Sequence, residues 1–265
     1  RVLANFIGHT NTLTSAVFSP DGGSVLTGSY DNPARITPLT FLLPLADLAL
    51  GFKSDYTRLD IASALSPDGA LAATGANDYS VALWDVVNAT ILRSLVGHGN
   101  RVSSIAFSPD GASVLTGSVD KTAKLWDTAD GTLIQTFTGH TESVTSVAFS
   151  ADATEILTCS NDGTARIWDS SSGQAVQILS SPGSIFHMYS AAFSPDGARV
   201  LTAIDGNMAM LWDAITGEQL LSFPHQGQVH SVVYAEDGAK ILTGSTDRTA
   251  KLWDAVTGAG LHGYG

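Results

Sequence analysis

The sequence predicts an all-β protein built from repeated units of four short antiparallel strands. A turn phrase of the type Ser-Pro-Asp-Gly recurs along the chain, and the segments beside it alternate apolar and polar residues. Only 14% of the 265 residues are charged, which suits short strands and tight turns better than amphipathic helices with charged outer faces. Because a fixed period is stronger evidence than any local pattern, we assign the strands from the repeat.

The repeat has a period of 41 to 47 residues and keeps one internal register. Its marker, the second residue of the turn phrase, lies at Pro20, Pro67, Pro109, Ala151, Pro195 and Glu236. Most units carry a His eleven residues before the marker, an Asp eleven after it, and Trp-Asp starting seventeen after it. We therefore predict a single domain over residues 1–265, with units at approximately 8–54, 55–96, 97–138, 139–182, 183–223 and 224–265.

Each unit shows the pattern of four strands. The segment SVTSVAFS (143–150) alternates as a first strand, and SVLTGS (113–118) is typical of a second strand. In most repeats a Pro-Asp-Gly turn separates the first strand from the second. A third strand such as TAKLWD (122–127) and a fourth such as TLIQTF (132–137) follow, with no helical period between them.

This register resembles the WD-repeat (Trp-Asp repeat) family over essentially the whole chain. Gly-His begins at Gly8, Gly97 and Gly139, in phase with the repeated Trp-Asp pairs, and the regular turns are most similar to arrays common in bacterial members. The resemblance implies a β-propeller, in which four-stranded blades surround a central channel. The Trp-Asp pairs begin at Trp84, Trp126, Trp168, Trp212 and Trp253.

We expect six blades, with residues 1–7 as the outer strand that closes the blade ending near Asp254. Such closure hides an exposed sheet edge. The glycine-rich end AGLHGYG (259–265) would then be a tail, because glycine weakens a strand. Two alternatives stay open: the chain is part of a larger ring, or its spare strand adds to a neighbour's sheet and builds a polymer.

A His, a hydroxyl and a carboxylate recur together, and these are the residue types of a nucleophilic triad. One active site needs one such set, whereas this set repeats, so we expect no catalytic residue. The resemblance implies instead that His, Thr, Asp and Trp form a hydrogen-bonded network inside each blade, where every buried polar group needs a partner. The predicted members are His9, Thr27, Asp31, Thr74, Asp78, Trp84, His98, Thr116, Asp120, Trp126, His140, Thr158, Asp162, Trp168, Thr202, Trp212, His225, Thr243, Asp247 and Trp253.

One copy of the third strand is rewritten as RITPLTFLLPLAD over residues 35–47. In register, Thr37 replaces the Trp and Pro38 replaces the Asp, and the unit is longer than the others. The apolar residues that follow either fold back over the missing indole or form an exposed contact site. A local sequence error would look the same. These residues are Phe41, Leu42 and Leu43.

The turns between strands four and one, and between strands two and three, lie on one face of such a sheet. The resemblance implies that partners bind there, and the residues at these turns vary in type while the framework repeats. Unit five concentrates large amphipathic side chains there, as binding hot spots do, although packing of its own rim is an alternative. The candidate residues are Tyr30, Arg58, Asn77, Asn100, Arg101, Val119, Glu142, Asn161, Phe186, His187, Gln226, Gln228 and Thr246, together with Phe41, Leu42 and Leu43.

Charge and cysteine content exclude several classes of function. The net charge is −12, from 25 acidic and 13 basic side chains without a basic cluster, so nucleic-acid binding is not expected. Cys159 is the only cysteine, which rules out an intrachain disulfide and a multi-cysteine metal site. No metal motif predicts a cofactor, and no apolar run is long enough to span a bilayer. A reducing compartment such as the cytoplasm fits best, and an extracellular location stays open.

The predicted function is a non-catalytic scaffold or sensor module that binds other proteins or peptides. The chain starts at Arg1 rather than Met, which is consistent with a piece of a larger signalling protein. One alternative is a structural propeller that associates with itself in an extracellular assembly. Another is a small-molecule-binding or hydrolytic propeller with its site at the channel mouth.

Overall fold

The structure is a computed structural model in which every described residue belongs to a strand, a turn or a connecting segment. It describes residues 13–18, 24–29, 35–38, 62–76, 78–88, 90–180 and 187–264. These residues contain 23 strands and no helix, so no helix among them is long and apolar enough to cross a membrane. The predicted all-β class is confirmed.

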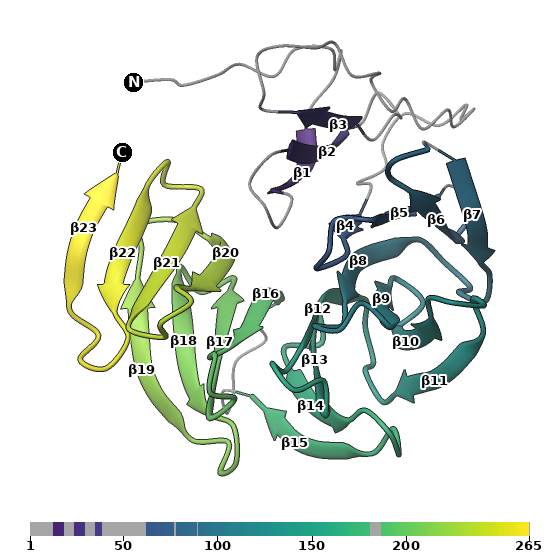
Figure 1. Ribbon diagram of the computed structural model, residues 1–265. Helices are drawn as coiled ribbons and strands as arrows, with labels where there is room; N and C mark the ends of the chain where they lie inside the picture. The colour runs from purple at the N-terminus through teal and green to yellow at the C-terminus, as the bar shows by residue number, and fades with distance from the viewer. Residues whose placement is uncertain are drawn as a thin grey trace. The chain divides into compact units, whose positions relative to one another are not determined.

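The strands form six antiparallel sheets, and each sheet takes its strands in chain order (Figure 1). The first sheet has three described strands, which are β1 (Leu13–Phe18), β2 (Ser24–Ser29) and β3 (Arg35–Pro38). The second sheet contains β4 (Ser63–Leu65), β5 (Leu71–Gly75), β6 (Val81–Asp85) and β7 (Thr90–Leu95). The third contains β8 (Val102–Phe107), β9 (Ser113–Ser118), β10 (Thr122–Asp127) and β11 (Leu133–Thr138).

The last three sheets repeat the same plan. The fourth contains β12 (Val144–Phe149), β13 (Glu155–Ser160), β14 (Ala165–Asp169) and β15 (Ala175–Leu179). The fifth contains β16 (Met188–Phe193), β17 (Arg199–Ile204), β18 (Met208–Asp213) and β19 (Gln219–Pro224). The sixth contains β20 (Val229–Tyr234), β21 (Lys240–Ser245), β22 (Ala250–Asp254) and β23 (Gly260–Tyr264).

The chain divides into two compact units, and the division passes through the third sheet. The first unit is Arg1–Val114 with Trp126–Leu133, and the second is Leu115–Leu125 with Ile134–Gly265. Within the second unit, the first strands of successive sheets pack against each other, β12 beside β16 and β16 beside β20. Within the first unit, β4 packs beside β8 in the same way.

Second and third strands supply most of the core. Leu157 and Leu201, on β13 and β17, are completely buried. Leu157 packs with Ile167, Met188 and Trp212 in one apolar cluster that joins the fourth and fifth sheets. Apolar side chains therefore join neighbouring sheets, as expected for repeats that cannot bury a core alone.

The strand register repeats in detail, including the rewritten copy. Ile156 on β13 faces Trp168 on β14, and Val25 on β2 faces Thr37 on β3 in the equivalent position. Thr37 thus occupies the Trp position, as the register predicted. Phe41, Leu42 and Leu43 lie outside the described residues.

The last sheet differs from the expected closure. Strand β23 pairs with β22, with Ala250 opposite Tyr264 and Leu252 opposite His262. The prediction of a C-terminal tail is therefore wrong for residues 260–264, because β23 occupies the position beside β22 that we assigned to residues 1–7. Glycine weakens an isolated strand, but pairing with a neighbouring strand overrides this preference. Residues 1–7 themselves lie outside the described residues.

Candidate functional site

A Trp–Thr hydrogen bond recurs inside the sheets. The indole N–H of Trp168 donates to Oγ1 of Thr158 at 2.9 Å, and three other sheets contain the same bond at the same length. Since Ile156 faces Trp168 across the strand pair, Thr158 lies two residues along on the same face of the sheet. The equivalent bonds join Trp84 to Thr74, Trp212 to Thr202 and Trp253 to Thr243.

In the fourth sheet the network is complete. Nε2 of His140 lies 2.7 Å from Oγ1 of Thr158, and Nδ1 lies 2.8 Å from Oδ2 of Asp162. Because the Thr158 hydroxyl already accepts from Trp168, it can donate its own proton to Nε2, and Nδ1–H can donate to Asp162. This hydrogen-bond pattern corresponds to the tautomer of His140 that carries a proton on Nδ1.

The sixth sheet repeats the arrangement. His225 lies 2.7 Å from Thr243 and 3.0 Å from Asp247. A side-chain hydrogen bond from Thr249 is the main cause that lowers the pKa of Asp247 well below its usual range. For Asp162, burial favours the protonated form, but hydrogen bonds from His140 and Thr164 outweigh it and lower the pKa.

These networks have the connectivity of a hydroxyl–His–carboxylate triad but not the accessibility of one. Thr158 and Thr243 are fully buried, and each hydroxyl accepts an indole N–H. A nucleophile must reach its substrate. The geometry therefore favours a structural role for both copies.

Members of the network are also present in other sheets. The rings of His98 and Trp126 meet edge to face at 6.2 Å, and Thr116 is buried on β9. Asp120 accepts a hydrogen bond from the Thr122 hydroxyl, and Asp78 accepts one from Ser80. Thr27 is buried on β2, whereas His9 and Asp31 lie outside the described residues.

The predicted partner-binding residues are divided between described and undescribed parts of the chain. The described ones lie in the connections between sheets or between second and third strands, and all are exposed or half-buried. They are Asn100, Arg101, Val119, Glu142, Asn161, His187, Gln226, Gln228 and Thr246. The others, outside the described residues, are Tyr30, Phe41, Leu42, Leu43, Arg58, Asn77 and Phe186.

Some of these connections lie in the second compact unit, Leu115–Leu125 with Ile134–Gly265. We call the surface that they form the connection face. Polar contacts cross it from each sheet to the next. Nζ of Lys121 donates to the Thr141 carbonyl oxygen at 2.5 Å, and Nδ1 of His187 lies 2.8 Å from the Asn161 carbonyl oxygen. Nε2 of Gln228 donates to Oδ1 of Asp205 at 2.6 Å.

The connection face also carries an aromatic pair that the sequence did not single out. The rings of Tyr189 on β16 and His230 on β20 lie 4.6 Å apart at 39°. Neither residue is among the predicted partner-binding residues. The sequence did contain a signal for this pair: each ring belongs to the second residue of the first strand of its repeat.

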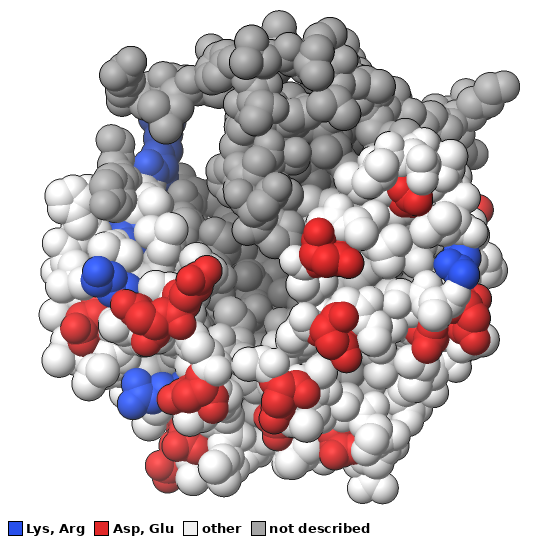
Figure 2. Space-filling model, viewed as in Figure 1, with Lys and Arg blue, Asp and Glu red and all other residues white. Residues whose placement is uncertain are grey.

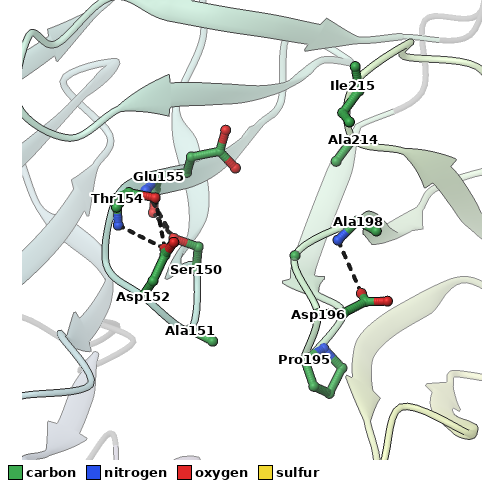
Figure 3. Close-up of a pocket in the computed structure, with 11 residues that line it drawn as sticks. Ser150, Ala151, Asp152, Thr154, Glu155, Pro195, Asp196, Ala198, Ala214 and Ile215 are labelled. Carbon is green, nitrogen blue, oxygen red and sulfur yellow. Dashed lines mark hydrogen bonds between the residues drawn. The ribbon is translucent and has the colours of Figure 1, made fainter.

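The opposite face of the sheets carries the hairpin turns and a shallow groove. The groove has a volume of about 540 Å³ and lies between the β12–β13 turn, the β16–β17 turn and the β18–β19 turn (Figure 3). Two of its carboxylates are held within their own turns: Asp152 accepts from the Thr154 and Ser150 side chains, and Asp196 accepts from the Ala198 N–H. The backbone N–H of Thr154 and these hydroxyls lower the pKa of Asp152 to about 2.

Acidic side chains dominate the exposed charge. On the face shown in Figure 2 they outnumber the basic ones, in line with 25 acidic and 13 basic residues in the chain. Within the described ranges, no group of three or more His, Cys, Asp or Glu side chains is placed to hold a metal ion.

The family model "WD domain, G-beta repeat" matches most of the chain, over residues 1–32, 57–85, 89–127, 131–169 and 217–254. The chain belongs to the WD40 repeat family. Its four-stranded sheets are the blades of a β-propeller. WD40 proteins generally act as protein-interaction scaffolds.

The WD40 model does not match residues 170–216, although β16, β17 and β18 of the four-stranded fifth blade lie there. This repeat lacks the His and has Gly206 at the position of the turn Asp. It nevertheless keeps the bond from Trp212 to Thr202 at 2.9 Å. The blade therefore persists although its sequence signature is weak.

Two relatives show which WD40 proteins the chain is similar to. It is 33% identical over 93 residues to guanine nucleotide-binding protein subunit beta-5b of Danio rerio, which covers 34% of this chain and 22% of that protein. It is 30% identical over 118 residues to nuclear distribution protein PAC1 of Arthroderma otae, covering 38% of this chain and 25% of that one. The match thus spans a quarter or less of each relative's length.

Proposed function

We propose that this chain is a non-catalytic protein-interaction scaffold or sensor module that binds a protein or peptide on the connection face. The observation that carries the proposal is the group of non-repeated contacts on that face. His187 with Asn161, Tyr189 with His230 and Asp205 with Gln228 each join neighbouring blades. A rigid repeated frame thus presents side chains that occur once, which is what specific recognition of a partner requires.

The absence of catalysis is part of the proposal. The repeated His, Thr and Asp residues that resemble a triad are buried and hydrogen-bonded to one another. Their removal is therefore expected to affect folding rather than turnover.

The test is capture of partners from cells of the source organism by the wild-type chain and two variants. One variant carries Y189A and H187A on the connection face. The other carries I215S and V256S, which remove exposed apolar side chains from hairpin turns on the opposite face. We expect a partner, identified by mass spectrometry and then purified, to bind the wild type and the second variant but not the first. Equal binding of that purified partner to all three proteins would contradict the proposal.

A second candidate function is self-association through the outer strands. Ile134 on β11 and Val176 on β15 are 51% and 59% exposed, and neither strand contains a charged residue. Charged side chains normally protect exposed sheet edges from pairing. Analytical ultracentrifugation of the wild type and of an I134K/V176K variant tests this candidate, which predicts oligomers for the wild type alone.

A further inference from the structure

We propose that Tyr189, Asp205 and His230 together bind a basic side chain, Arg or Lys, of a partner peptide. This inference rests on the proposed function, since it names the chemistry of a partner on the connection face. It is carried by three features of the fifth and sixth blades. These are a carboxylate displaced from its usual network, an aromatic pair beside it, and the charge of the chain.

The first feature is the carboxylate. In the fourth and sixth blades, Asp162 and Asp247 are occupied by the His of the same blade. In the fifth blade Gly206 stands in that register, and the preceding Asp205 bonds instead to Gln228 of the next blade through Oδ1. From the described residues, Oδ2 of Asp205 receives no hydrogen bond. One oxygen is thus held in place while the other can accept from a ligand.

The second feature is the aromatic pair. Tyr189 is half-buried and His230 is exposed, and their rings are 4.6 Å apart. Asp205 lies beside the start of β16, because its backbone N–H donates to the carbonyl oxygen of His187 at 3.0 Å, two residues before Tyr189. Burial, followed by the negative charge of Asp205, raises the pKa of Tyr189. A cation above an aromatic face is attracted by its ring electrons, and more strongly when the site is partly desolvated.

The third feature is charge, which decides between the ligand classes. An acidic side chain would be repelled by Asp205 and by the net charge of −12. An apolar side chain would desolvate the carboxylate without giving it a partner, which costs free energy. A basic side chain can form an ion pair with the carboxylate and also contact the face of the aromatic ring. Arg is expected to bind more tightly than Lys, because its planar guanidinium stacks on rings and donates two parallel hydrogen bonds.

The test uses short peptides and nuclear magnetic resonance of the ring signals of Tyr189 and His230. The probes are N-acetylated, C-amidated Gly-Gly-Arg-Gly-Gly and the same peptide with citrulline, a neutral analogue of Arg, at concentrations up to about 10 mM. We expect the Arg peptide to shift both ring signals in a saturable way. The citrulline peptide should bind at least about tenfold more weakly.

Two charge-matched variants locate the site. D205N keeps an oxygen that can accept from Gln228 but removes the negative charge. It should weaken binding of the Arg peptide about tenfold. E218Q changes the net charge equally, at the exposed β18–β19 turn, and should bind as the wild type does. Circular dichroism confirms that both variants are folded.

The inference is overturned if the Arg peptide does not bind, if citrulline binds equally well, or if D205N binds like the wild type. Such a result leaves the scaffold proposal standing, because that proposal is measured separately by partner binding to the Y189A/H187A variant. A different result would separate the two proposals: the Y189A/H187A variant still binds the purified partner, and D205N no longer binds the Arg peptide. In that case the scaffold proposal fails, and the site for a basic side chain stands with a function other than binding that partner.

Discussion

The hydroxyl of Thr158 accepts a hydrogen bond from the indole of Trp168 at 2.9 Å and lies 2.7 Å from Nε2 of His140. One buried oxygen therefore satisfies two large side chains from different parts of the blade. The same relationship holds for Thr243 with Trp253 and His225.

Replacing Thr158 by Val should destabilise the protein while keeping the shape of the side chain. It leaves the Trp168 N–H and a ring nitrogen of His140 buried without this partner, at about 1–3 kcal/mol for each group. Urea unfolding measures the loss. T138V, at an exposed position of β11, is the control and should change stability little; equal stability of the two variants would show that the network contributes nothing.

Acidification should remove part of the stability through Asp162. Its pKa is lowered in the folded state, so its contribution is complete above the unfolded pKa of about 4 and is lost as the pH falls below that value. D162N should be less stable than the wild type at pH 7 and should lose less stability between pH 7 and pH 3. E236Q, at an exposed turn, should follow the wild type at both pH values.

Glu155 should act with the opposite sign. Burial, with the charges of Asp152 and Asp169, raises its pKa, so the ionised form destabilises the folded state above that pKa. E155Q should therefore raise the melting temperature at pH 7, and the gain should disappear as the pH falls through the raised pKa. A lower melting temperature at pH 7 would mean that the carboxylate has a stabilising partner instead, and E218Q provides the exposed control.

Gly117 should tolerate no side chain because the next blade packs against it. A Cβ there would lie 2.7 Å from a methyl carbon of Val144 and 2.7 Å from one of Val147. G117A should cost about 1–3 kcal/mol in urea unfolding. G263A, where no atom lies within 4 Å of the added carbon, should cost less.

A second substitution tests the cause of the G117A effect. In the next repeat, Cys159 stands at the position of Gly117, and Ala191 stands at the position of Val147. Cys159 is fully buried in the same cluster as Ala191, so a side chain is accommodated where the facing residue is Ala. Adding V147A should therefore restore part of the stability lost in G117A. If the double variant loses the sum of both single effects, the contact with Val147 is not the cause.

Much of the fold followed from the period of the sequence. Alternation and turn residues predicted the strands, and the spacing placed Thr37 at the Trp position, where the structure pairs it with Val25. Strand β23 was missed because Gly260 and Gly263 weaken local propensity, whereas the register beside Leu252 and Trp253 is a property of the sheet.

The connection face was only partly predictable. Turn positions within one repeat identified Asn161, His187 and Gln228 as surface residues. Their contacts, such as Asp205 with Gln228 and Tyr189 with His230, join different repeats. They depend on how first strands pack side by side, which a pattern within one repeat does not contain.

The split between contacts inside a blade and contacts across the connection face has an evolutionary consequence. The bonds that hold His140, Thr158 and Trp168 stay within one repeat, so selection for folding acts on residues that recur in most copies. Residues such as Tyr189 and Asp205 lie outside that set. A duplicated repeat can therefore acquire a new binding preference while its inherited frame continues to fold.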